Sequence, residues 1–154
     1  MELKNILTSA KVGELTLTEV PILDPSNTID VASAEMRNHS HGSALVCLDG
    51  KLVGIFTERD LLKVIAGGAK LDSTISEVMT KNPETSSTED SLFEAIQAMD
   101  QGGYRRLPVV NAEQDPVGLI DVKTVTHFLV EHFPETVYNQ ASHAQLIAQH
   151  REGA

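Results

Sequence analysis

The feature that most constrains this 154-residue chain is an internal repeat. Residues 28–36 read TIDVASAEM, and residues 91–99 read SLFEAIQAM, so an offset of 63 aligns Ile29 with Leu92, Ala32 with Ala95 and Met36 with Met99. Later, residues 45–49 match residues 107–111, and residues 53–55 match residues 117–119. Two similar sequences fold into two similar units, so the chain is restricted to a pseudo-symmetric architecture with a period of about sixty residues.

Each unit is predicted to run helix, strand, turn, strand, helix. In the first unit, apolar periodicity predicts a helix over residues 29–38, strands over 44–48 and 52–56, and a helix over 58–66 that ends at Gly67-Gly68. Asp49-Gly50 between the two strands is a strong hairpin signal. The second unit repeats the order at residues 91–100, 107–110, 116–120 and 123–132, with a turn that is two residues longer.

The fold class is therefore mixed α/β, with two repeats that each carry a short sheet and two helices. A unit of about sixty residues buries too little surface to be stable alone, so the two units are expected to pack against each other through their sheets. The predicted organisation is an N-terminal segment 1–9, a first repeat 10–70, a second repeat 71–133 and a polar tail 134–154. The tail is either a loose arm or a segment that binds a partner.

Composition excludes several classes of function. The formal net charge of −10 argues against a nucleic-acid partner, because phosphate contacts require clustered Lys and Arg. The longest apolar runs are strand-sized, far below the roughly 20 residues that span a bilayer, so no membrane segment is expected. The N-terminus does not resemble a signal peptide, and the single Cys47 sits among apolar neighbours, which favours a cytoplasmic location.

The stretch VMTKNPETSSTEDSLFEAIQAMDQGGYRRLPVVN, followed by PVGLID, and the earlier copy ending in LVGIFTERDLL resemble a tandem pair of cystathionine β-synthase (CBS) domains, often called a Bateman module. The resemblance covers about residues 10–133. It implies a module that binds adenosine-containing ligands such as AMP, ADP, ATP or S-adenosylmethionine in clefts between the repeats. It also implies that two chains associate as a flat homodimer.

The family's ligand signature, Gly-hydrophobic-x-Thr/Ser-x-x-Asp, is matched by GIFTERD at residues 54–60. An ionised Asp60 offers two acceptor oxygens to the two adjacent hydroxyls of a ribose. Thr57 begins the following helix, where its hydroxyl and nearby backbone N–H groups suit a phosphate. The alternative is purely structural, because Thr-x-x-Asp at a helix start is close to a capping box in which the two side chains satisfy the helix N–H groups.

The second copy, GLIDVKT, carries Asp121 at the threonine position and Thr124 at the aspartate position. Asp121 remains a good helix cap, but Thr124 has one hydroxyl and no charge for a ribose. One nucleoside site per chain is therefore predicted, at Asp60, with the other cleft degenerate or used differently.

The resemblance implies that the rest of the pocket is formed by Ile55 and by two stretches of the second repeat. Apolar side chains would sandwich an adenine, and Arg105 and Arg106, the chain's only adjacent basic pair, suit phosphate oxygens. The alternative is an ion pair of these arginines at the dimer or domain interface, for example to Glu113 or Asp115. The predicted nucleotide-binding residues are Ile55, Thr57, Asp60, Thr74, Ile75, Val78, Met79, Tyr104, Arg105, Arg106 and Pro108.

No pattern of catalytic residues is present, so an enzyme is not expected. His39 and His41 supply too few ligands for a metal site. The function predicted is a regulatory module that binds an adenine nucleotide, with no further cofactor, and signals to an unknown effector protein. Two alternatives stay open: an S-adenosylmethionine module that leaves Arg105 and Arg106 unused, and a scaffold with vestigial sites.

Overall fold

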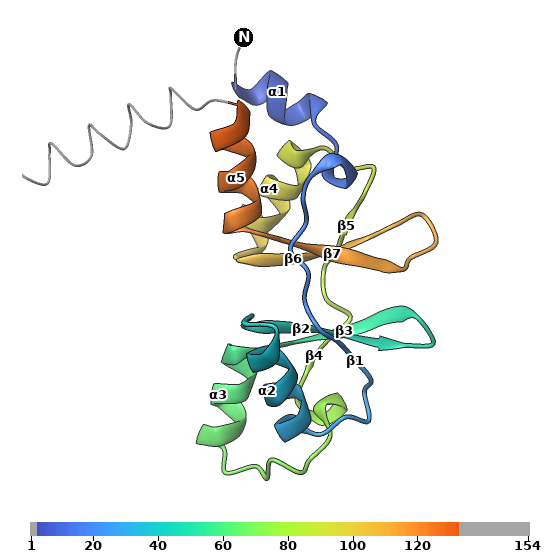
Figure 1. The fold of residues 1–154 in the computed structure, drawn as a ribbon, viewed down its shortest axis with the longest axis vertical. Helices are drawn as coiled ribbons and strands as arrows, with labels where there is room; N and C mark the ends of the chain where they lie inside the picture. The colour runs from blue at the N-terminus through green and yellow to red at the C-terminus, as the bar shows by residue number, and fades with distance from the viewer. Residues whose placement is uncertain (1–2, 133–154) are drawn as a thin grey trace, which may run out of the picture.

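The computed structural model describes residues 3–132, in two stacked repeats (Figure 1). The first repeat contains α2 (Ile29–Asn38), β2 (Ser43–Leu48), β3 (Lys51–Thr57) and α3 (Glu58–Ala66). The second contains α4 (Leu92–Gly102), β6 (Arg106–Val110), β7 (Pro116–Asp121) and α5 (Val122–His132). These eight elements confirm the predicted order, and every boundary lies within two residues of its expected place.

Several short elements have no counterpart in the prediction. They are α1 (Leu3–Ser9), the 3₁₀ turns η1 (Val12–Glu14) and η2 (Ile75–Glu77), and the two-residue strands β1 (Ile22–Leu23), β4 (Thr80–Lys81) and β5 (Ser86–Ser87). A strand of two residues has no periodicity from which it can be recognised. The predicted tail, residues 134–154, lies outside the described residues.

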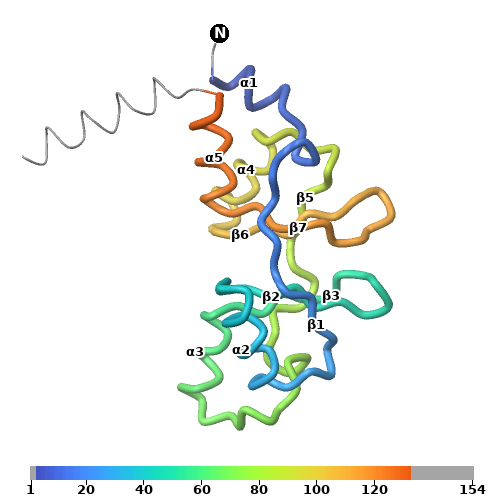
Figure 2. The backbone as a smooth tube through the Cα atoms, in the orientation of Figure 1, coloured from blue at the N-terminus to red at the C-terminus, as the bar shows by residue number. Residues whose placement is uncertain are grey.

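The segments leading into each repeat join the two halves. The first sheet has the order β1-β2-β3-β4, so β4, which precedes the second repeat in sequence, pairs with the sheet of the first. In the other direction, Thr18 forms a bridge with Leu119 on β7 before the chain reaches β1. Figure 2 shows both segments running along the two sheets. Each repeat therefore borrows backbone pairing from the segment that leads into the other.

The strand register corrects the repeat alignment by one residue. Val46 pairs with Gly54, and Val109 pairs with Gly118, so the offset of 63 continues through the first strand of each hairpin. The hairpin of the second repeat is thus longer by one residue, not two. Leu45 corresponds to Pro108 and Ser43 to Arg106, because both hairpins carry a bulge at the same point, after Val46 and after Val109.

Apolar clusters within and between the repeats hold the fold together. One fills the first repeat between the sheet and helices α2 and α3, and a second fills the equivalent space of the second repeat. A third lies between the sheets, where buried Leu45 and Ile55 meet Leu119. Each such side chain contributes roughly 1.5–3 kcal/mol when fully buried. The expected packing of the repeats through their sheets is confirmed.

The N-terminal helix α1 belongs to the second repeat in space. Its buried Leu7 lies in a cluster with Leu92 of α4 and Phe128 of α5. Figure 1 accordingly shows α1 beside α4 and α5, although the first repeat follows it in sequence.

Candidate functional site

The first cleft begins where β3 passes into α3. Thr57 has extended backbone angles (φ −126°, ψ 167°) and is the helix N-cap. The Asp60 amide donates to the Thr57 hydroxyl (3.4 Å), and the Thr57 amide and hydroxyl donate to Asp60 Oδ2 (3.0 and 3.1 Å). Such a capping box satisfies helix N–H groups and stabilises by about 1 kcal/mol. The structural alternative for Thr-x-x-Asp is therefore present in the fold.

Capping uses only one oxygen of Asp60. The other oxygen, Oδ1, has a single contact at 3.5 Å, from the hydroxyl of Thr80. The residue as a whole is 7% exposed. Because a carboxylate oxygen accepts two hydrogen bonds, Oδ1 retains capacity that the cap does not use. Thr80 was not among the predicted site residues. Its place follows from the pairing of β4 with β3, which no sequence pattern indicates.

The apolar side of this cleft comes from the end of the segment that leads into the second repeat. Thr80 pairs with Ile55, and the sulfur of Met79 lies where a Cβ on Gly54 would stand, 2.5 Å from that position. Val78 and Met79 are half-buried against the core of the first repeat. Gly54, the glycine of the ligand signature, has no side chain and so leaves room for the Met79 side chain to lie over β3.

Two predicted residues of this segment lie elsewhere. Thr74 forms a bridge with Thr28 at the start of α2, whereas Thr57 pairs with Ser43, just beyond the end of α2. The ten-residue helix α2, about 15 Å long, lies in sequence between these two partners. Ile75 is completely buried in the core of the first repeat and offers no surface to a base.

The residues of the second repeat that were predicted to line the first cleft lie just before β6 and at its start. The ring of Tyr104, 44% exposed, folds back over Gly102, where an added Cβ would stand 2.1 Å from a ring carbon. Arg105 is exposed and Arg106 half-buried, whereas Pro108 is buried. Within residues 3–132 neither arginine forms an ion pair, and Asp115 pairs with Lys51 (2.6 Å) instead. Within a single chain, residues 3–132 therefore contain no ion pair from either arginine to Glu113 or Asp115.

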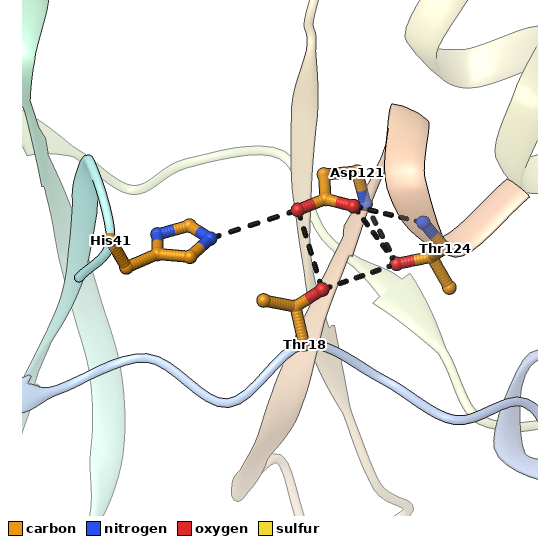
Figure 3. Close-up of polar contacts among 4 residues, drawn as sticks. All are labelled: Thr18, His41, Asp121 and Thr124. Carbon is orange, nitrogen blue, oxygen red and sulfur yellow. Dashed lines mark hydrogen bonds and ion pairs between the residues drawn. The ribbon is translucent and has the colours of Figure 1, made fainter. Parts of the chain in front are cut away.

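The second cleft holds a connected polar cluster, shown in Figure 3. The Thr124 amide and hydroxyl donate to Asp121 Oδ1 (2.9 and 3.1 Å), and the Asp121 amide donates to the Thr124 hydroxyl (3.2 Å). The hydroxyl of Thr18 donates to Asp121 Oδ2 (3.3 Å). Capping is thus preserved with the two residue types exchanged, and the Thr124 hydroxyl is fully engaged within the protein.

A histidine of the first repeat completes this cluster. His41 Nε2 lies 3.7 Å from Asp121 Oδ2, with 16% and 11% of the two side chains exposed. Figure 3 shows the ring pointing across from the first repeat toward the carboxylate. Sequence reasoning missed this contact. With the corrected register, His41 is the counterpart of Tyr104, and that equivalence is the signal that would have found it.

The cluster sets the charge state of Asp121. Burial alone would raise the pKa of its carboxyl group, but the hydrogen bonds from Thr124 and from Thr18, together with the nearby His41 ring, outweigh burial and hold the pKa below its usual value. Asp121 is therefore ionised near neutral pH. A carboxylate surrounded by donors in this way is already satisfied by the protein.

Two cavities lie near these clefts. One of about 350 Å³ is bounded by α1, residues 14–16 and α5, and reaches Thr124 and Phe128. Another of about 500 Å³ lies under the hairpin tips, beside Lys51, Asn82 and Gln114. Asp60 lines neither of these two cavities.

Two kinds of feature are absent from the described part of the chain. Among residues 3–132 no three His, Cys, Asp or Glu side chains are grouped to hold a metal ion. His39 lies 3.8 Å from Glu35, away from the Asp121 contact of His41. No helix in the same range is long and apolar enough to cross a bilayer.

Comparison with known proteins matches both repeats to one family. Residues 12–67 and 75–131 each fit the family model described as the CBS domain. An uncharacterized 17.7 kDa protein of Acidianus ambivalens is 30% identical over 125 residues, which cover 80% of this chain and 75% of that protein. The CBS domain-containing protein CBSCBSPB1 of Arabidopsis thaliana is 36% identical over 115 residues, 73% of this chain but only 21% of that much longer protein.

Solved structures have the same fold. The CBS domain protein PAE2072 from Pyrobaculum aerophilum, complexed with AMP, gives a TM-score of 0.69 at 23% identity and covers 74% of this chain and 88% of that one. The CBS domain pair of protein MJ0100, in complex with 5′-methylthioadenosine and S-adenosyl-L-methionine, gives a TM-score of 0.69 at 27% identity. The match covers 78% of this chain and 99% of that pair.

Proposed function

This chain belongs to the CBS domain family as a tandem pair, and from that premise we propose that its first cleft binds an adenine nucleotide and that occupancy regulates a partner protein. Structural relatives in complex with AMP and with S-adenosyl-L-methionine support an adenosine-containing ligand. The proposal concerns binding and signalling, and it assigns no catalytic step to the chain.

One observation carries the choice of cleft. Asp60 satisfies the α3 cap with Oδ2 and keeps Oδ1 with only a 3.5 Å contact from Thr80. A ribose presents two neighbouring hydroxyl donors, and bonds from hydroxyls to a carboxylate are among the stronger hydrogen bonds in proteins. The corresponding hydroxyl of Thr124 is already engaged on both sides by Asp121. The first cleft is therefore the nucleoside site, and each chain binds one nucleotide.

Neighbouring groups complete the proposed site. Val78 and Met79 supply an apolar wall for the adenine, and Met79 already crosses β3 at Gly54. Arg105 and Arg106 have no carboxylate partner within residues 3–132, so they are available to phosphate oxygens. Their structural counterparts in the first repeat are the uncharged Gly42 and Ser43, so this basic pair serves one cleft only.

The signal is proposed to pass through a homodimer. Helices α3 and α5 expose apolar side chains, among them Leu62 (67%), Ile65 (59%) and Val122 (61%). Burying such a face against a second copy would remove it from water. A ligand that bridges the two repeats changes the dimer only if it binds one arrangement more tightly than the other. Light scattering with and without nucleotide measures both the dimer and its response.

Calorimetric titration tests the site. The wild-type protein is titrated with AMP, ADP, ATP and S-adenosylmethionine beside Asp60→Asn, which keeps an acceptor for the cap but removes the charge. Asp121→Asn is the matched control, because it makes the same change at the start of α5. We expect one nucleotide per chain, loss of binding in Asp60→Asn and unchanged binding in the control.

A double variant, Arg105→Gln with Arg106→Gln, separates the ligand classes. Weaker binding of AMP, ADP and ATP with unchanged S-adenosylmethionine binding is expected, because only the nucleotides carry phosphates. Binding that survives Asp60→Asn but is lost in Thr124→Ala would overturn the choice of cleft. If the wild type bound none of the four compounds, the scaffold function would replace the sensor.

A further inference from the structure

The second cleft contains a titratable pair that connects the repeats. His41 precedes β2 in the first repeat, and its Nε2 atom lies 3.7 Å from Asp121 Oδ2 at the end of β7 in the second. Both side chains are mostly buried, and the contact spans the boundary between the repeats (Figure 3). In the first cleft, the position equivalent to His41 is occupied by Tyr104. Tyr104 makes no such contact, because its ring lies against Gly102.

The carboxylate of this pair is held independently of the histidine. Thr124 binds Oδ1 through its amide and hydroxyl, and Thr18 binds Oδ2. Asp121 therefore stays in place and ionised whether or not His41 is charged. The variable member of the pair is the imidazole, the only side chain that normally changes charge between about pH 5 and 8.

We propose that the second cleft is a proton-binding site, in which a doubly protonated His41 pairs with Asp121 and ties the start of β2 to the junction of β7 and α5. At 3.7 Å the neutral ring is beyond normal hydrogen-bond length, so it gains little from the carboxylate. An imidazolium gains a Coulomb attraction that does not need closer contact. The tie therefore belongs to the imidazolium form of His41 and is absent from the neutral form.

Asp121 is the single polar contact of the His41 ring within the described residues. His41 Nδ1 is buried and has no hydrogen-bond partner within the described residues. The Asp121 carboxylate is the acid that contacts the ring, through Nε2. Glu58 is a further acid beside the adjacent residue, because its carboxylate lies 2.7 Å from where a Cβ on Gly42 would stand. The other charged or titratable residues on the surrounding elements are Glu19, Asp30, Glu35, Arg37, His39, Arg59, Asp60, Lys63, Arg106, Lys123, His127, Glu131 and His132.

A double-mutant cycle isolates the pair from these neighbours. His41→Gln keeps a neutral donor that does not titrate, and Asp121→Asn keeps a helix cap without the charge. Urea unfolding of the wild type, both single variants and the double variant gives the coupling between the two positions. We expect a coupling of about fivefold in the unfolding equilibrium at about pH 5.5, and less than about 1.5-fold at about pH 8.

His39→Gln serves as the matched control, since His39 lies two residues away and contacts Glu35 instead. We expect it to show no coupling to Asp121 at either pH. Equal coupling of His41 and Asp121 at both pH values, or none at either, would overturn the proposal. The cycle contains no nucleotide, so its outcome is independent of whether the first cleft binds one.

Discussion

The two clefts have the same backbone and opposite polar chemistry. In each, a strand passes into a helix through a Thr and an Asp three residues apart that cap the helix together. In the first cleft Asp is the second residue of the pair, and one of its carboxylate oxygens is not used by the cap. With Asp in the first position, the carboxylate is saturated by Thr18, Thr124 and His41.

This difference separates folding from ligand binding. A helix cap needs one acceptor and one reciprocal partner, and either order of Thr and Asp supplies them. A ribose needs a carboxylate at one particular position. Under the proposed function, the exchange of two residues therefore leaves the fold intact while it removes the ribose acceptor from the second cleft.

The largest expected effect comes from imposing the second cleft's order on the first. Thr57→Asp combined with Asp60→Thr should keep the α3 cap, so that the free energy of unfolding changes by less than about 1 kcal/mol. Nucleotide affinity should fall about 100-fold, because two hydrogen bonds to a charged acceptor are lost. Urea unfolding measures the first quantity and calorimetry the second. A variant that is well folded and still binds tightly would show that the order of the two residues does not select the cleft.

Glycine substitution should also distinguish the clefts. A methyl group on Gly118, where φ is 155°, would lie 2.7 Å from Leu17 Cβ, next to the backbone. On Gly54 it would meet the sulfur of Met79, which belongs to a flexible side chain. Gly118→Ala should cost about 2–3 kcal/mol through strain and overpacking, and Gly54→Ala about 1 kcal/mol.

The same pair of variants has a second readout. Gly54→Ala should displace Met79 and weaken nucleotide binding, whereas Gly118→Ala should leave affinity unchanged in the fraction that remains folded. Urea midpoints and calorimetry measure the two effects. The distinction would fail if both substitutions cost the same stability and neither changed affinity.

Local sequence signals predicted the eight main elements because each signal acts within a few residues. The repeated apolar periodicity, the Asp49-Gly50 turn and the glycine pair after α3 all specify neighbouring backbone. The same signals placed the Thr57 and Asp60 pair at the start of α3, where the structure has it.

Contacts between distant segments could not be predicted in this way. The pairing of β4 with β3, which brings Thr80 to Asp60, depends on how one repeat lies on the other. Predicting the His41 contact required the correct strand register, and with a one-residue error in the repeat alignment His41 was not matched to Tyr104. Register is set by bulges and cross-strand packing, which a short apolar stretch does not specify.

Acid titration should reveal the carboxylate of the second cleft. The folded-state pKa of Asp121 lies below its usual value, so its contribution to stability is present above that usual value and is lost as the pH falls through the folded-state pKa. Asp121→Asn should therefore unfold at a lower urea concentration than wild type at about pH 6, and the difference should shrink towards about pH 2. A constant difference across that range would mean that the charge of Asp121 contributes no stability.

The smallest effect is expected at the opposite edge of the repeats. Lys51 donates to Asp115 Oδ1 and to the carbonyl of Glu113, both at 2.6 Å, and so links the two hairpins. Unlike the His41 contact, this link is about half exposed, so water and salt screen it. Lys51→Ala should lower the urea midpoint only slightly at low ionic strength, and the difference should vanish in about 0.5 M NaCl. The His41 and Asp121 coupling should persist in the same salt, because a mostly buried pair is screened less. If salt abolished both, burial would not be what distinguishes the two links between the repeats.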